Sequence, residues 1–179
     1  MKKTLLLLIL LTTTITYAQK NNNGSENIFG IKIGLIGGWL NYEKSLSEKI
    51  TLNTEFGYEG GFLKGTDSKI DYVFTSTFSI EPRYYYNFEK RKEKGKKTNN
   101  NSANYFSTEI LYVSDLLSST NRNNLTINTS FGLIPKYGLR RVLSKKLNFE
   151  FAFGLGYSWG ENNINGITSA LDLRISLKL

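Results

Sequence analysis

The sequence has no cysteine and no histidine among its 179 residues, and only two prolines. Without cysteine there can be no disulfide framework, no thiolate nucleophile, no zinc ribbon and no lipid-bearing cysteine of a lipoprotein. Without histidine, the usual catalytic triads and the commonest metal ligand are excluded as well. These absences remove most familiar hydrolase chemistry, so we expect neither an enzyme nor a site for a metal or a cofactor.

Long apolar stretches are also missing, apart from a short run at the start of the chain. Two lysines precede the apolar run Leu5–Leu11, and Ala18 follows at a position suited to cleavage. A basic start, a short apolar segment and a small-residue site are typical of a secretory signal peptide. The run is shorter than the roughly 20 residues that a membrane-spanning helix needs. We therefore interpret residues 1–18 as a signal peptide, rather than a buried N-terminal strand, and residues 19–179 as one exported domain.

What the sequence has in abundance is alternation of apolar and polar residues with a period of two, which is typical of β-strands. The clearest case is Leu147–Trp159, where every odd position is large and apolar and every even position is small or polar. The same alternation predicts strands at residues 50–58, 72–87, 105–114, 125–140 and 171–179. Because no comparable helical period occurs, the sequence predicts an all-β domain.

A change of phase near the N-terminus predicts two further strands. The apolar positions are odd from Phe29 to Leu35 but even from Leu40 to Leu46. A single continuous strand would place Glu43 on the apolar face, where a charge costs up to roughly 2–4 kcal/mol near the middle of a membrane. A turn at Gly37-Gly38 removes this conflict, because paired glycines readily adopt the positive φ of tight turns. The number of predicted strands then becomes eight.

The connections between these strands alternate in length. Leu46–Lys49 and Leu143–Lys146 are predicted to be tight turns, and Phe88–Asn104 is the longest connection, basic at first and then rich in asparagine. Strand parity places Phe88–Asn104 on the side of the tight turns. Longer polar loops are expected on the other side, at residues 60–71, 116–124 and 160–166. Short turns alternating with longer loops are typical of outer-membrane barrels.

Strands of about ten residues with one wholly apolar face fit a tilted transmembrane β-strand. Every backbone amide in hydrocarbon needs a partner, so such a sheet must close. The predicted fold is an all-β, eight-stranded antiparallel up-and-down transmembrane β-barrel with a filled polar lumen. The alternative is a soluble barrel or sandwich with its apolar face inward, but the opposite face carries glycines and charges of both signs. Two interfacial girdles are expected: Tyr42, Tyr84, Tyr86 and Tyr137 beside the short turns, and Tyr58, Tyr72, Tyr157 and Trp159 beside the long loops.

An eight-stranded barrel is just wide enough for side chains to fill its interior. Because a buried charge must be paired, we interpret the charges that strand parity directs inward as a salt-bridge network that plugs the barrel. A narrow ion path, or a carboxylate pair acting as acid and base, is the alternative. The predicted lumenal residues are Lys32, Glu43, Glu55, Glu81, Arg83, Glu109, Lys136, Arg140, Glu150, Asp172 and Arg174.

Three short motifs carry a resemblance to a known group of proteins. They are Tyr42-Glu43, Glu81-Pro82-Arg83-Tyr84 and Gly154-Leu155-Gly156-Tyr157. Over most of the mature chain, the sequence resembles small eight-stranded outer-membrane barrels of Gram-negative bacteria, of the outer-membrane protein A and X type, and more narrowly an uncharacterised outer-membrane β-barrel family. The resemblance implies a fold, a location in the outer membrane and, as partners, its lipids, the barrel-assembly machinery and periplasmic chaperones. It implies no activity. In many such barrels the last strand ends in an aromatic residue, where this chain has Leu179.

The formal net charge of +8 is distributed unevenly. Two units lie in the predicted signal peptide, and six bases against two acids give four net units between Glu89 and Lys97. The rest of the chain is therefore close to neutral, and the charge does not indicate a nucleic-acid surface. We interpret the basic run Lys90–Lys97 as a solvated, flexible turn, with contact to the cell wall or to anionic headgroups as the functional alternative.

Together these patterns predict a monomeric, integral outer-membrane β-barrel with a structural or interaction role in the cell envelope. A narrow ion or small-solute channel is one alternative, and the filled lumen argues against it. A membrane enzyme acting on lipids or peptides is another, and the missing histidine argues against it. A soluble secreted β-barrel that binds an apolar ligand in its core is the third.

Overall fold

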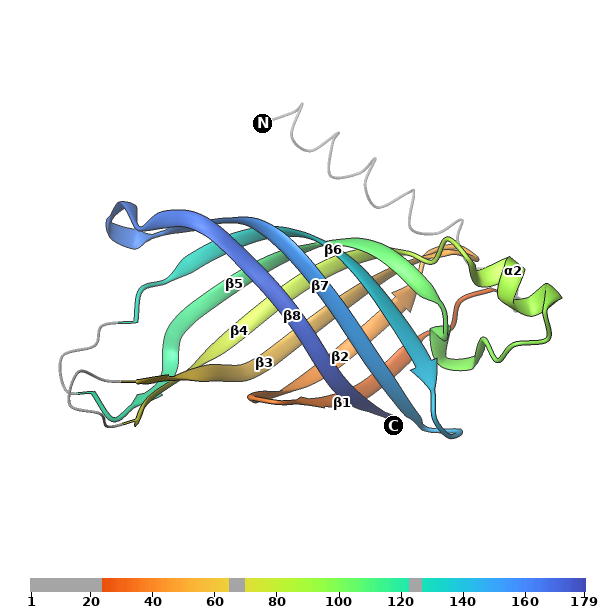
Figure 1. Cartoon of the computed structure of the whole chain (residues 1–179), viewed down its shortest axis with the longest axis horizontal. Helices are drawn as coiled ribbons and strands as arrows, with labels where there is room; N and C mark the ends of the chain where they lie inside the picture. Colours follow the sequence, from red (N-terminus) through yellow and green to blue (C-terminus); the bar gives the residue numbers. More distant parts are fainter. Residues whose placement is uncertain (1–23, 65–69, 123–126) are drawn as a thin grey trace, which may run out of the picture.

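A computed structural model describes residues 24–64, 70–122 and 127–179, so the predicted signal peptide, residues 1–18, lies outside the described residues. Eight antiparallel strands follow one another around a closed barrel (Figure 1). The predicted all-β, up-and-down arrangement of eight strands is confirmed. The strands are β1 (Ile28–Gly34), β2 (Gly37–Ser45), β3 (Ile50–Lys64), β4 (Ile70–Tyr84), β5 (Asn104–Thr120), β6 (Ser130–Val142), β7 (Leu147–Gly160) and β8 (Asn165–Lys178).

Alternation along each strand separates a polar interior from an apolar outer wall. On β7, Asn148 and Glu150 are buried inside the barrel, whereas Phe153 and Leu155 are 52% and 71% exposed on its outside. Successive side chains of a strand point to opposite faces, so the period seen in the sequence fixes this division. The arrangement is the reverse of an ordinary β-domain, in which the apolar face forms the core.

The first hairpin turns at Leu35-Ile36, between the paired residues Gly34 and Gly37. The prediction of a turn at Gly37-Gly38 was therefore wrong by two residues, although the two strands that it separated are both present. Both of these glycines belong to β2, and among the described glycines only Gly95 has a positive φ.

The glycines around the first hairpin make room for an indole. Trp39 is buried on the lumenal face of β2, and a Cβ added at Gly34 or Gly37 would lie 2.9 Å from atoms of its ring. A Cβ at Gly57, on the neighbouring strand β3, would overlap the same ring. Close packing against Trp39, and not turn geometry, is the reason for glycine at these positions.

The two tight turns lie where the sequence predicts them, at Leu46–Lys49 and Leu143–Lys146. Their hydrogen bonds correspond: the first amide of each turn donates to the carbonyl of the next strand's first residue, at 2.9 Å and 2.8 Å. In both turns the serine Oγ accepts a bond of 3.2 Å from the amide of that same strand residue. The repeated Leu-Ser-Xaa-Lys sequence thus gives the same turn twice.

The strands on the opposite side are longer than predicted. β3 and β4 pair as far as Lys64 and Ile70, and β5 reaches Thr120 after an irregularity in its pairing beside Thr75 and Ser76. The predicted loops at 60–71, 116–124 and 160–166 were therefore too long. The strand predicted at 125–140 was too long at its start, because β6 begins at Ser130 and residues 127–129 are not in a strand. Residues 65–69 and 123–126 lie outside the described residues. The end of β3 could not be recognised in the sequence, because Gly60 and Gly61 have no side chains and so interrupt the alternation of apolar and polar residues.

The barrel closes between its first and last strands. β1 and β8 are joined by five paired positions, Gly30–Gly34 against Arg174–Lys178, the shortest ladder in the barrel. By comparison, β3 and β4 pair over fifteen positions, from Ile50–Lys64 to Ile70–Tyr84. The seam between β1 and β8 therefore has the fewest backbone hydrogen bonds to hold it.

The connection between β4 and β5 holds a short helix, α2 (Phe88–Glu93), and a 3-10 turn, η2 (Asn99–Asn101), at the end of the barrel that carries the tight turns (Figure 1). Gly95, with φ of +62°, follows the helix in the left-handed conformation common at helix ends. The prediction of a solvated turn concerned Lys90–Lys97, which is exposed except for the half-buried Arg91, although residues 90–93 belong to α2 and not to a turn. Asn100 and Asn101 of η2, by contrast, are buried. Among the described residues, no helix is long and apolar enough to cross a membrane.

Candidate functional site

Charged side chains are concentrated in the lumen of the barrel. All eleven charged residues predicted to face it are buried inside the barrel, none more than 7% exposed. Every strand contributes at least one of them, so the set is assembled from the whole length of the chain. Six of the eleven are acids and five are bases, and a further acid, Glu59, lines the loop end of the lumen.

Eight of these residues form a closed ring in which acids and bases alternate. Seven of the eight contacts have N···O distances between 2.6 and 3.2 Å, and the eighth joins Arg83 to Glu81. Each charge in the ring therefore lies between two opposite charges, as burial requires. Starting from Glu150, the ring runs through Lys32, Glu55, Arg174, Asp172, Lys136, Glu81 and Arg83, and returns to Glu150.

The three remaining charges attach to this ring as branches. Arg140 contacts Glu150 at 2.7 Å and Glu43 at 2.6 Å. Glu109 contacts Lys136 at 3.1 Å. Glu150 thus has three cations around it, Lys32, Arg83 and Arg140, whereas Glu109 has one, so the network is centred on Glu150.

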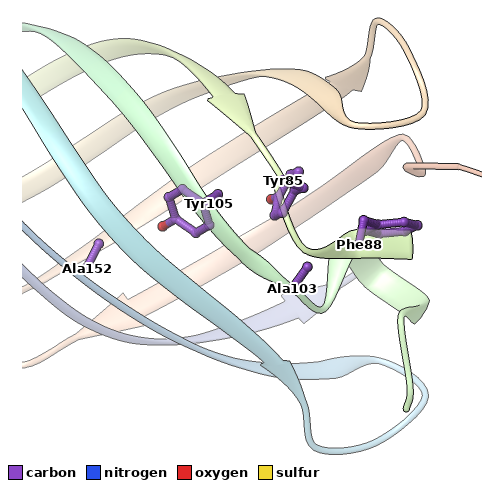
Figure 2. Packing of buried hydrophobic residues seen from close by; sticks show 5 residues of the cluster. All are labelled: Tyr85, Phe88, Ala103, Tyr105 and Ala152. Carbon is purple, nitrogen blue, oxygen red and sulfur yellow. The ribbon is translucent and has the colours of Figure 1, made fainter. Parts of the chain in front are cut away.

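Buried aromatic residues, the aromatic layer, pack beside the charged network toward the turn end of the barrel, and Figure 2 shows Tyr85, Tyr105 and Phe88 there. Tyr85 packs edge-on against Tyr105 at 5.4 Å and against Phe88 at 6.4 Å, measured between ring centroids. The Tyr85 hydroxyl donates to Glu43 at 2.8 Å, and the Tyr105 hydroxyl donates to Glu150 at 3.3 Å. Burial raises the pKa of the Tyr85 hydroxyl well above its ordinary value, so the group remains a neutral donor.

Asparagines of η2 fasten the β4–β5 connection over the same end. The Asn101 amide group donates to the backbone carbonyl of Glu26 at 2.9 Å and to the carboxylate of Glu43 at 3.1 Å, and its Oδ1 accepts the Glu26 amide at 2.7 Å. Asn100 donates to the carbonyl of Lys145 in the second tight turn at 3.1 Å. The segment before β1, the loop after α2 and a tight turn are thereby tied together across the mouth.

The loop end of the lumen is hollow. A cavity of about 460 Å³ lies there, lined by Trp39, Thr75, Leu111, Ile134 and the ring residue Arg174, among others. The Arg174 guanidinium lies over the Trp39 ring, 3.9 Å from its centroid. The charged network and the buried aromatic residues lie between this cavity, the vestibule, and the turn end of the lumen.

Three lumenal aromatic residues were not predicted: Trp39, Tyr85 and Tyr105. The signal that could have found them was present, because Trp39 shares the parity of Glu43 and Tyr105 shares that of Glu109. The predicted lumenal set contains charged residues alone, so it includes none of these three.

The eight residues predicted to form girdles point away from the lumen. Tyr42, Tyr58, Tyr84, Tyr86, Tyr157 and Trp159 are exposed, and Tyr72 and Tyr137 are half-buried among neighbours on the outer wall. At the turn end the hydroxyls of Tyr86 and Tyr137 lie 3.2 Å apart. At the loop end the rings of Tyr58 and Phe74 are stacked with their centroids 5.8 Å apart, and the ring centroids of Tyr157 and Trp159 are 5.1 Å apart.

Replacing Tyr85 with phenylalanine is expected to lower the free energy of unfolding by about 1.5–3 kcal/mol, because Glu43 loses a donor inside the barrel. The neighbouring Tyr84 is exposed and provides the matched control, since Tyr84→Phe removes a hydroxyl of the outer wall. Urea unfolding of the refolded protein measures both variants. Equal losses of stability from Tyr84→Phe and Tyr85→Phe would contradict the stabilising hydrogen bond from the Tyr85 hydroxyl to Glu43.

In the part of the chain that the structure describes, no group of three or more carboxylate side chains is arranged to hold a metal ion. Neither a scan against protein-family models nor a search of curated proteins gave a match to this chain. What the barrel can do must therefore be argued from its geometry.

Proposed function

We propose that this chain is an integral outer-membrane β-barrel of a Gram-negative bacterium, exported by an N-terminal signal peptide, with a structural or interaction role in the cell envelope. Its lumen is a plug held together by charge, and it neither conducts nor catalyses. The outer membrane's lipids are its surroundings, and the barrel-assembly machinery and periplasmic chaperones are its partners during assembly.

The apolar outer wall carries this proposal. Phe29, Phe56, Phe78, Phe153 and Leu171 come from five different strands, and each is between 44% and 72% exposed. Soluble monomers seldom expose a contiguous apolar patch larger than a few hundred Å². A wall of this kind around a whole barrel needs hydrocarbon as its solvent, and the closed sheet meets the requirement that no backbone edge faces lipid.

The interior argues against the other functions. A soluble barrel that binds an apolar ligand needs an apolar core, whereas this lumen buries eleven charges. A channel needs a continuous path, whereas the ring and the Tyr85–Tyr105 layer separate the vestibule from the turn end. An enzyme needs reactive groups free to meet a substrate, whereas the six carboxylates of the charged network are each engaged with a cation.

Flotation with neutral phosphatidylcholine vesicles tests the membrane location. We expect the refolded chain to float with the vesicles, to resist extraction by carbonate or urea, and to migrate differently on a gel before and after boiling. A water-soluble, unheated form that stays at the bottom of the gradient would contradict the proposal.

Planar-bilayer recording tests the closed lumen. We expect no conductance steps from the inserted wild-type barrel at either polarity, while a sixteen-stranded porin gives steps in the same apparatus because its wider barrel leaves an aqueous channel. Regular steps from the wild-type protein would favour the channel instead.

A further inference from the structure

A second concentration of charge lies outside the lumen, at the turn end of the barrel. A cavity of about 410 Å³ between α2, the loop after it and the end of β6 is lined by Lys90, Arg91, Lys94, Lys96, Arg141 and Tyr86. Five of these six residues are cations, and no acidic residue lines the cavity. Helix α2 thus presents its basic residues to Arg141, a base on the barrel wall, rather than to an acid.

The cations are not neutralised by the protein. Among the residues that the structure describes, none of these five bases is within ion-pair distance of a carboxylate, and Glu89 of the same helix pairs with Lys49 instead, at 2.9 Å. The Nε of Arg91 is buried without a hydrogen-bond partner among the described atoms. Burial and the neighbouring Arg141 lower the pKa of Arg91, the sign of a cation held without a counter-charge.

Both arginines are held in place by other contacts. Arg91 donates to the carbonyl of Lys97 at 3.0 Å. Arg141 donates to the carbonyl of Arg140 at 2.7 Å and to the side chain of Asn104 at 2.5 Å. Like charges fixed near one another are unfavourable in themselves, so a bound anion would gain attraction to both without the cost of ordering them.

The cavity adjoins the aromatic part of the outer wall. Asn104, which accepts from Arg141, donates to the hydroxyls of Tyr137 at 2.7 Å and Tyr86 at 3.1 Å. The Tyr86 ring lies 5.2 Å from that of Phe106, which is 54% exposed on the lipid-facing side of β5. A basic cavity therefore continues directly into an exposed apolar surface, and a ligand that fills both must be amphipathic.

We propose that this cavity binds the phosphate-bearing headgroup of an anionic phospholipid, with Arg91 and Arg141 contacting the phosphate and the acyl chains lying along Tyr137 and Phe106. The proposal rests on the membrane location proposed above, and it assigns the turn end of the barrel to the leaflet that carries this lipid. Arg guanidinium groups recognise phosphate through paired N–H donors, and basic residues beside a membrane attract anionic lipids.

Lipid titration followed by native mass spectrometry of the refolded chain in neutral detergent tests the site. Phosphatidylglycerol and phosphatidylcholine with the same acyl chains are the two probes. We expect wild type to retain phosphatidylglycerol about tenfold better than phosphatidylcholine, and the double variant Arg91→Gln/Arg141→Gln to lose that preference. The exposed residues Lys94 and Lys96 provide a second variant, Lys94→Gln/Lys96→Gln, which leaves the packed arginines intact and should lower the preference severalfold.

The matched control is Lys145→Gln/Lys146→Gln, which removes two exposed charges from the tight turn at the same end. It should keep the preference of wild type. Equal retention of the two lipids by wild type, or an equal loss in the control and the cavity variants, would overturn the site. If inorganic phosphate binds as tightly as phosphatidylglycerol, the ligand of the cavity is a free anion, and the proposal of a bound lipid is wrong. A chain that fails to float with neutral vesicles contradicts the membrane location, which separates that failure from a failure of this site.

Discussion

An arginine in place of Leu155 is expected to lower the free energy of unfolding by about 2–4 kcal/mol in a lipid bilayer, the cost of a cation on the lipid face of a barrel. Leu155 is 71% exposed and lies in the middle of β7. In a soluble protein, a substitution at so exposed a position changes stability by only about 0.5 kcal/mol. The size of the loss in unfolding free energy therefore shows whether the outer wall faces lipid or water.

Urea unfolding of the protein refolded into phosphatidylcholine vesicles measures this effect. Leu143→Arg is the matched control, because Leu143 is 57% exposed but lies in a tight turn at the barrel's end. We expect the control to lose little stability. If Leu155→Arg unfolds at the same urea concentration as wild type, the wall does not face hydrocarbon and the proposed location is wrong.

The other large effect is expected at Glu150. Changing it to glutamine leaves Lys32, Arg83 and Arg140 without their shared carboxylate inside the barrel, and breaking a buried ion pair typically costs about 3–5 kcal/mol. Glu109→Gln should cost less, because Glu109 has a single cationic neighbour. The exposed Glu161, between β7 and β8, supplies the control variant Glu161→Gln, which should be nearly neutral.

A double variant tests whether these charges act as one network. If Lys32 is destabilising once its partner is lost, then Lys32→Met/Glu150→Gln should be more stable than the sum of the single losses predicts, by about 0.5–3 kcal/mol. Strict additivity would mean that the two residues are not coupled. Should Glu150→Gln fail to refold, Glu109→Gln, Lys136→Met and their combination provide the same comparison on a pair in contact at 3.1 Å.

Much of the barrel could be predicted because a strand's alternation is local. The parity that directs Phe153 outward and Glu150 inward can be seen in consecutive residues, and it identified the strands, the two tight turns and eleven charged residues of the lumen. The predicted set lacks Glu59, which shares the parity of Glu55 and lines the cavity at the loop end. Parity also carries no information on which charges touch. The contact between Lys32 and Glu150 joins residues 118 positions apart, and only the closed barrel brings them together.

Other features could not be predicted because they depend on contacts outside the strands. Asn101 has no partner in its own neighbourhood of the sequence; it is bound to Glu26, 75 positions away. The position of the first turn could not be predicted because Gly34, Gly37 and Gly38 are all candidates in the sequence, whereas the structure uses Gly34 and Gly37 to make room for Trp39. The basic cavity likewise needs Arg141, which β6 brings beside a helix that precedes it by about fifty residues.

The short ladder between β1 and β8 also bears on the order of folding. Lys32 on β1 reaches Glu150 on β7, and Arg174 on β8 reaches Glu55 on β3, so two ionic contacts cross the seam that only five paired positions hold. Neither contact can form until the first strand meets the last. An unclosed sheet would therefore leave these charges without partners. In the proposed outer-membrane location we expect closure of the barrel to be all-or-none, because a sheet whose first and last strands have not met would expose unpaired charges.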